Sequence, residues 1–235
     1  MKPVLIRQHE EMTPPGLLVD WLEERGIPYE VHHSYKGQAV PDPSDYAFVA
    51  SLGSPYGPND THEPSVVDEL ELIGTSVEKD VPVLGLCFGG EVLSVVLGGS
   101  VERAPVPELG WREIETQDPG TIPAGPWLEW HYERFTPPPG AVEVARTADA
   151  VQAFRMGPHL GVQFHPESTV EIVAHWAGMD TENLTGLGIE DGRVLLDVAP
   201  ETEEAARRSA FRLFDAFLEG LRESGKVAGD AGGKE

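Results

Sequence analysis

The stretch VPVLGLCFGGEVLSVVLGGSV, residues 81–101, holds the only cysteine of the chain between an apolar run and a pair of glycines. Residues 81–87 form a short continuous apolar run, which is typical of a buried parallel strand. The pattern from about Gly89 to Leu97 predicts a helix that begins directly after the cysteine. The sequence therefore predicts a tight strand-to-helix turn with Cys87 at the carboxyl edge of a sheet.

The segments before this turn alternate between strand and helix patterns. Strands are predicted at 2–8, 28–35 and 45–57, and helices at 13–27 and 64–80. Such alternation is typical of a parallel sheet covered by helices. We therefore predict an α/β fold: a single flavodoxin-like, doubly wound domain whose central, mostly parallel sheet is flanked by helices.

The second half of the chain predicts a small antiparallel β addition. Strands are expected at 112–117 and 141–147, joined by a proline-rich connection at 122–141, and a hairpin at 151–167 turns at Gly157 and Pro158. An apolar stripe predicts a long helix at 201–224. We expect the domain to occupy residues 1–223 and the end of the chain, 224–235, to be a disordered tail.

Composition excludes several classes of function. The 235 residues carry a net charge of −23, which repels phosphate backbones and anionic lipid, so we expect neither nucleic-acid nor membrane binding. A single cysteine excludes an intramolecular disulfide and a thiolate-rich metal site. The start of the chain lacks a signal-peptide pattern, and no window reaches the roughly 20 apolar residues of a membrane span. We expect a cytoplasmic protein without metal or cofactor.

The predicted turn gives Cys87 the setting of a nucleophile. Open α/β sheets bind ligands at the carboxyl edge, where this side chain is expected to lie. The amino end of the following helix favours the thiolate, and its free N–H groups can stabilise an oxyanion on a substrate carbonyl. A lone buried cysteine is more often inert packing, so the hypothesis needs a base elsewhere in the chain.

His165 and Glu167 supply that base and a group to orient it. Both follow an apolar strand in LGVQFHPES, with Pro166 between them. In extended chain, residues two apart point the same way, so the carboxylate can bond one ring nitrogen while the other faces sulfur. Cys87, His165 and Glu167 form a candidate catalytic triad. We assign solvent-exposed or packing roles to the histidines without such a setting, namely His9, His32, His33, His62, His159 and His175.

These motifs resemble the class I, triad-type glutamine amidotransferases, whose pattern is a Gly-x-Cys-x-Gly-x-Gln elbow followed later by His-Pro-Glu. Here the elbow reads GLCFGGE at 85–91 and the second motif HPE at 165–167. The similarity extends over roughly residues 4–176. It includes FVASLGSPYGPND, which resembles the family's oxyanion loop, and WHYERF, which resembles its histidine-containing loop.

The resemblance implies a reaction and further site residues. Cys87 would attack the side-chain amide of glutamine, and His165 would pass a proton to the departing ammonia and later activate water against the γ-glutamyl thioester. Backbone N–H groups of Phe88 and of the Gly53–Ser54 turn would form the oxyanion hole. Nothing in the sequence resembles a domain that accepts ammonia, so the acceptor is expected to be a separate synthetase.

Two positions bear on the substrate. Glu91 stands where amidotransferases usually carry glutamine, and the related γ-glutamyl hydrolases are similar in having glutamate there. A carboxylate would attract the α-ammonium of the substrate and repel its α-carboxylate, whereas the alternative is neutral drift on a helix face. His131 matches a family position near the substrate. We predict both as substrate-binding residues.

Three alternatives stay open at this point. The first is a γ-glutamyl hydrolase or peptidase that cleaves a γ-glutamyl amide through the same acyl-enzyme. The second is a family member kept as a non-catalytic binding subunit, against which the intact triad argues. The third, an α/β-hydrolase-like esterase, fits the elbow but not a histidine and an acid so close together.

Overall fold

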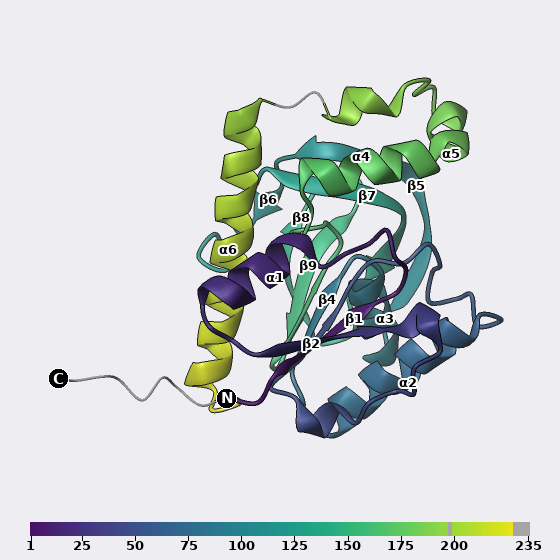
Figure 1. The fold of residues 1–235 in the computed structure, drawn as a ribbon. Helices are drawn as coiled ribbons and strands as arrows, with labels where there is room; N and C mark the ends of the chain where they lie inside the picture. The colour runs from purple at the N-terminus through teal and green to yellow at the C-terminus, as the bar shows by residue number, and fades with distance from the viewer. Residues whose placement is uncertain (197–198, 228–235) are drawn as a thin grey trace.

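A computed structural model of the protein describes residues 1–196 and 199–227, which form a mostly parallel sheet in the order β2-β1-β3-β4-β10-β9-β8-β6 (Figure 1). Its strands are β1 (Val4–Gln8), β2 (Tyr29–His33), β3 (Val49–Ser51), β4 (Val83–Leu86), β6 (Glu115–Thr116), β8 (Val142–Arg146), β9 (Val151–Met156) and β10 (His159–Val162). The strands from β2 to β10 pair in parallel, and β9, β8 and β6 continue the sheet antiparallel. The predicted hairpin at Gly157 and Pro158 joins β9 to β10.

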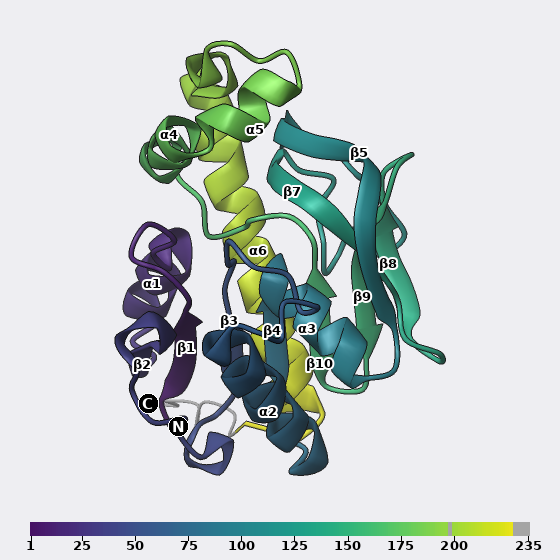
Figure 2. The same cartoon turned by 90° about the vertical axis from the view of Figure 1, so that its right-hand side faces the viewer.

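Helices cover both faces of the sheet, because successive side chains of a strand point to opposite faces. On β1, Val4 and Ile6 join the core that packs against α1 (Gly16–Glu24) and α6 (Pro200–Glu223). Leu5 joins the core against α2 (Pro64–Glu78) and α3 (Phe88–Val96). Figures 1 and 2 show the two helix pairs on either side of the sheet. The predicted fold class is confirmed.

The turn between β4 and α3 has a strained backbone, as the sequence suggests. Cys87 has φ of 52° and ψ of −110°, a combination that non-glycine residues rarely adopt. Its N–H donates to the carbonyl of Val162 over 2.9 Å, and its carbonyl accepts from the N–H of Glu91, so both neighbouring elements hold the turn. A Cβ at Gly89 would lie 2.2 Å from the carbonyl oxygen of Ser51, and one at Gly85 2.4 Å from that of Gly89. These glycines let α3 lie directly on β3 and β4.

This contact predicts that Gly89→Ala destabilises the fold, by at least about 2 kcal/mol, because the new methyl group meets backbone that cannot move aside. Gly74 is the matched control, since it also lies inside a helix but has open space around its Cα. Gly74→Ala is expected to stabilise the protein by up to about 1 kcal/mol. Urea unfolding followed by circular dichroism measures both, and equal midpoints would contradict the close packing.

A two-stranded ribbon, β5 (Ser100–Arg112) and β7 (Trp127–Thr136), stands apart from the main sheet (Figure 2). The prediction here was wrong, because β7 lies within the expected proline-rich connection and no strand was expected over most of β5. β5 was not predicted because proline is rare inside strands, and Pro105 and Pro107 interrupt the strand pattern of the sequence. They are tolerated because the register of the ribbon shifts between Arg103 and Glu108, where ladder hydrogen bonds are interrupted.

The last part of the described chain is helical. The long helix predicted at 201–224 is α6, whose apolar stripe is buried. The sequence analysis missed α4 (Val170–Met179) and α5 (Thr181–Gly186), although Thr169 accepts the N–H of Ile172 as an N-cap, a signal readable in the sequence. Within residues 1–196 and 199–227, three short 3₁₀ helices lie at Ser34–Lys36, Pro43–Asp45 and Gly192–Leu196. None of the helices described has both the length and the apolar character needed to cross a bilayer.

The predicted tail begins at 224, directly after α6. Residues 224–227 instead turn back on the helix, where the N–H of Lys226 donates to the carbonyl of Leu221 over 2.8 Å. This turn brings the apolar side chain of Val227 into the core, where only 7% of its surface is exposed. The remainder of the predicted tail, 228–235, lies outside the described residues.

Candidate functional site

The carboxyl edge of the parallel strands carries a cavity of about 440 Å³ with Cys87 in its wall. Cys87 is 8% exposed, and it reaches this cavity because β4 ends at Leu86 and α3 begins at Phe88. The predicted site residues that line the same cavity are Gly53, Ser54, Cys87, Phe88, Glu91, His131 and His165. The structure thus brings together residues that lie far apart in the sequence.

His165 and Glu167 are held as an oriented pair. The Nδ1 atom of His165 lies 2.8 Å from Oε1 of Glu167, and both side chains are buried. The backbone of the pair is anchored at each end. The N–H of His165 donates to the carbonyl of Leu128 in β7, and the carbonyl of Glu167 accepts from the N–H of Leu17 in α1. With Nδ1 bound to the carboxylate, Nε2 is the nitrogen left for another partner.

The charges around His165 favour its protonated form. Burial, the strongest influence, lowers the pKa of His165, but the opposing charges and hydrogen bonds of Cys87 and Glu167 raise that pKa well above 6.5. The ring of Trp176 in α4 meets the imidazole edge-to-face, with 4.7 Å between ring centroids. Its indole N–H donates to the carbonyl of Met12, which fixes the tryptophan in turn. Sequence reasoning missed this support because α4 was not predicted.

Backbone N–H groups converge on the cavity beside Cys87. Phe88 is the first residue of α3, so its N–H has no acceptor within the helix. In the described part of the chain, the N–H groups of Gly53 and Ser54 take part in no hydrogen bond. Ser54 is not among the residues with positive φ, so a side chain is tolerated there. Gly53 is needed for space, since a Cβ would lie 2.9 Å from Cε1 of His165.

Glu91 lies one helical turn beyond Cys87 and lines the same cavity. Its Oε1 accepts a hydrogen bond of 2.9 Å from Nε2 of the buried Gln163. The amide of Gln163 cannot flip, because its Oε1 accepts from the backbone N–H of Phe135, which can only donate. Burial raises the pKa of Glu91 to about 7, although the hydrogen bond from Gln163 opposes that shift.

This pKa predicts a pH-dependent effect of Glu91→Gln on stability. The ordinary pKa of this carboxyl group is 4.5. Between about pH 4.5 and 7 the folded protein therefore keeps a proton on Glu91 that the unfolded chain releases, and the free energy of unfolding falls as the pH rises through this range. Glutamine preserves an acceptor for Gln163 and cannot ionise. We expect the variant to be more stable than the wild type by on the order of 3 kcal/mol at pH 8 and equally stable near pH 4.

Urea unfolding at a series of pH values measures the difference between the two proteins. Glu71→Gln, an exposed position on α2, is the control and should leave the stability curve unchanged. A Glu91→Gln variant with the same stability as the wild type at every pH would contradict the shifted ionisation.

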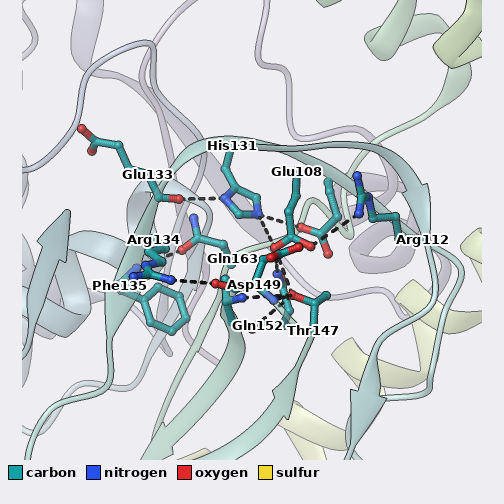
Figure 3. Close-up of polar contacts among 12 residues, drawn as sticks. Glu108, Arg112, His131, Glu133, Arg134, Phe135, Thr147, Asp149, Gln152 and Gln163 are labelled. Atoms are coloured by element: carbon teal, nitrogen blue, oxygen red, sulfur yellow. Dashed lines mark hydrogen bonds and ion pairs between the residues drawn. The ribbon is translucent and has the colours of Figure 1, made fainter. Parts of the chain in front are cut away.

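His131 lies in β7, with its ring in a group of acceptors beside the cavity (Figure 3). Nδ1 is 2.7 Å from the carbonyl oxygen of Glu133, and Nε2 is 3.2 Å from a carboxylate oxygen of Glu129 and 3.5 Å from one of Glu108. Burial lowers the pKa of His131, but the two carboxylates raise it to about 10. Nδ1 is therefore used within the protein, while Nε2 makes ion-pair contacts but no conventional hydrogen bond among the described residues, and the ring can act on a substrate through its charge.

The outer wall of the cavity comes from residues to which the sequence analysis gave no firm role. Trp130 donates to Oδ2 of Asp180 over 3.0 Å, and the hydroxyl of Tyr132 donates to the same oxygen. Arg103 lies over the ring of Tyr132, 5.0 Å from its centroid, and is a cation that faces the cavity. Arg112 and Arg134 do not line the cavity and form ion pairs with Glu108 and Glu102.

The family model for class I glutamine amidotransferases matches residues 17–173, more than half of the chain. Among curated proteins, one subunit of the glutamine-hydrolysing GMP synthase of Saccharolobus solfataricus is 38% identical over 132 residues, which are 51% of this chain and 66% of that protein. The GMP synthase of Aeropyrum pernix is 36% identical over 140 residues, 56% of this chain and 25% of that protein. The chain thus spans less than two thirds of each of these two relatives.

Solved structures agree with the sequence matches. A glutamine amidotransferase from Methylobacillus flagellatus superposes with a TM-score of 0.86 at 27% identity, covering 100% of both chains. One from Thermotoga maritima gives a TM-score of 0.82 at 28% identity, covering 92% of this chain and 98% of that one. By sequence and by fold, this chain belongs to the class I glutamine amidotransferase family.

Proposed function

We propose that the protein hydrolyses the side-chain amide of glutamine through a γ-glutamyl thioester on Cys87, releasing glutamate and ammonia. The observation that carries the proposal is the convergence of a cysteine on a strained turn, a carboxylate-oriented histidine and free backbone N–H groups on one cavity. Membership of the amidotransferase family supports the choice of glutamine as the amide.

The residues have the following roles in this proposal. The Cys87 thiolate attacks the amide carbon, and the N–H groups of Phe88 and of the Gly53–Ser54 turn hold the oxygen as it becomes negative. The amide nitrogen takes a proton from His165 and leaves as ammonia, so that Sγ and the γ-carbonyl form a thioester. Water then attacks the thioester, giving a proton to His165, and glutamate departs from the regenerated thiolate. Glu167 holds the imidazole in the orientation that both steps require.

The ammonia is proposed to pass to a synthetase on another chain. Several relatives are named as single subunits of a glutamine-hydrolysing GMP synthase, which supports an acceptor on a separate polypeptide. The free thiol of Cys87 suits a cytoplasmic enzyme, since a reduced cysteine persists there.

Glu91 favours a second candidate, cleavage of a γ-glutamyl amide other than glutamine, because a carboxylate replaces the family's glutamine in the cavity wall. Ammonia release from L-glutamine and nitroaniline release from γ-glutamyl-p-nitroanilide separate the two. We expect turnover of L-glutamine. Negligible turnover of glutamine with fast cleavage of the anilide would replace the first proposal with the second, and no reaction with either would remove both.

A further inference from the structure

The contacts of the His131 ring indicate its charge. A backbone carbonyl only accepts, so the Nδ1 atom that faces the carbonyl of Glu133 must carry a proton. Nε2 faces carboxylate oxygens of Glu129 and Glu108, and a lone pair there would be repelled by the ionised carboxylate of Glu108. Each ring nitrogen therefore carries hydrogen, and His131 is an imidazolium with only 3% of its surface exposed.

Glu108 is built to remain ionised beside this ring. It lies directly opposite His131 in the β5–β7 ribbon, and its Oε2 accepts hydrogen bonds from Thr147 over 3.1 Å and from Gln152 over 2.8 Å. Burial raises the pKa of Glu108, but His131, the hydroxyl of Thr147 and Arg112 lower it below its ordinary value. Glu108 is thus the carboxylate that keeps the imidazolium charged.

Glu129 completes the pair of counter-ions but is held differently. Its side chain is fully buried, and within the described chain neither carboxylate oxygen has a conventional hydrogen bond. Burial raises the pKa of Glu129, while His131 opposes that shift. Glu129 and Glu108 thus both act as counter-ions of the ring, and Glu108 is the one whose ionised state further donors support.

The imidazolium acts on the catalytic cavity. His131 and Cys87 both line it, and the negative charge of Cys87 is among the influences that raise the pKa of His131. Such an interaction is mutual, so the ring stabilises negative charge on sulfur. Other titratable residues line the same cavity, namely Glu10, Tyr56, Asp60, Glu91, Arg103, Tyr132, Glu133, His165 and Asp180.

We infer that His131 is a fixed imidazolium that holds negative charge at Cys87, and that Glu108 is a positioning residue that keeps this ring charged from outside the cavity. The inference deepens the proposed function, on which it rests for the role of Cys87 as nucleophile. It assigns a role to Glu108, a residue of the ribbon that does not line the cavity.

Alkylation of the single thiol tests this inference without any turnover. Iodoacetamide forms a thioether on Sγ with loss of iodide, and mass spectrometry gives the rate at each pH, since Cys87 is the only cysteine. For Glu108→Gln we expect the pH midpoint of alkylation to move upward by about one unit, which lowers the rate at acidic pH by about tenfold. Glu108→Asp retains the negative charge and should restore most of that rate.

Glu102→Gln is the matched control, because Glu102 lies on the same strand with a side chain that is 60% exposed and pairs with Arg134. Its alkylation profile should equal that of the wild type. If Glu108→Gln does not fold, nitrogen NMR of the ¹⁵N-histidine-labelled wild type replaces it, and His131 should show two protonated ring nitrogens at pH 8.

An unchanged profile in folded Glu108→Gln, or a neutral His131 ring at pH 8, would overturn the inference. These outcomes are separable from failure of the proposed function. If the wild type does not hydrolyse glutamine but Glu108→Gln shifts the pH midpoint of alkylation upward, the proposed function fails and the inference about His131 stands. If the wild type hydrolyses glutamine but Glu108→Gln causes no shift, the proposed function stands and the role of Glu108 fails.

Discussion

Cys87→Ala is expected to reduce glutamine hydrolysis by at least about 10⁴-fold while leaving the fold intact. The variant removes the atom that forms the thioester, and the oxyanion N–H groups and the base have no covalent step left to assist. Alanine fits the space of the thiol, because Cys87 is the N-terminal flanking residue of α3 and its own side chain makes no cap hydrogen bond.

Ammonia release measured at saturating L-glutamine gives the size of this effect, and the unfolding midpoint checks the fold. The alanine variant, purified identically, also sets the background of any contaminating glutaminase. Residual activity within tenfold of the wild type would show that Cys87 is not the nucleophile. A wild type that hydrolyses glutamine no faster than Cys87→Ala but still binds a partner protein would be a non-catalytic subunit.

His165→Asn should lower the hydrolysis rate by at least about 10³-fold, because no other group then moves protons between sulfur, ammonia and water. Asparagine retains a polar side chain near Oε1 of Glu167 but cannot act as a base. Trp176 packs against the ring of His165, and the backbone N–H of His165 donates to the carbonyl of Leu128. Both contacts hold the residue in place.

The control for this variant is His175→Asn, an exposed histidine of α4 whose ring, among the described residues, bonds only the carbonyl of Glu171. It should retain full activity. The two variants should also differ in the rate at which Cys87 is alkylated at neutral pH. We expect a lower rate in His165→Asn and the wild-type rate in His175→Asn. Near-normal glutamine turnover in His165→Asn would rule out its role as the proton carrier.

The sequence revealed the parts of the site that sit on regular elements. Cys87 follows a short apolar strand and precedes a helix, and His165 follows another strand, so the ends of parallel strands predict their common location at one edge. In the structure both line one cavity, and Glu167 lies within hydrogen-bond distance of His165. Local patterns suffice here because a tight turn fixes each side chain relative to its strand.

The rest of the site depends on packing between distant segments. The ribbon of β5 and β7 was missed because prolines interrupt the strand pattern of β5. In β7, the buried Glu129 and His131 stand between aromatic residues, so the strand shows no simple apolar face. Glu108 lies beside His131 only through the register of that ribbon, whereas Glu129 precedes His131 by two residues on the same strand. Glutamate is rarely buried, so a sequence pattern predicts a surface position for it. The role of Glu108 and Glu129 as buried counter-ions could therefore not be predicted.

The central claim is that the sulfur of Cys87 takes up the γ-glutamyl group of glutamine. Mass spectrometry after incubation with 6-diazo-5-oxo-norleucine, a glutamine mimic that alkylates a nucleophile with loss of dinitrogen, tests it most directly. We predict one adduct per chain, on Cys87, formed more slowly when L-glutamine is present as a competitor and absent in Cys87→Ala. An unmodified Cys87, or an adduct at a different residue that forms equally fast in Cys87→Ala, would contradict the account.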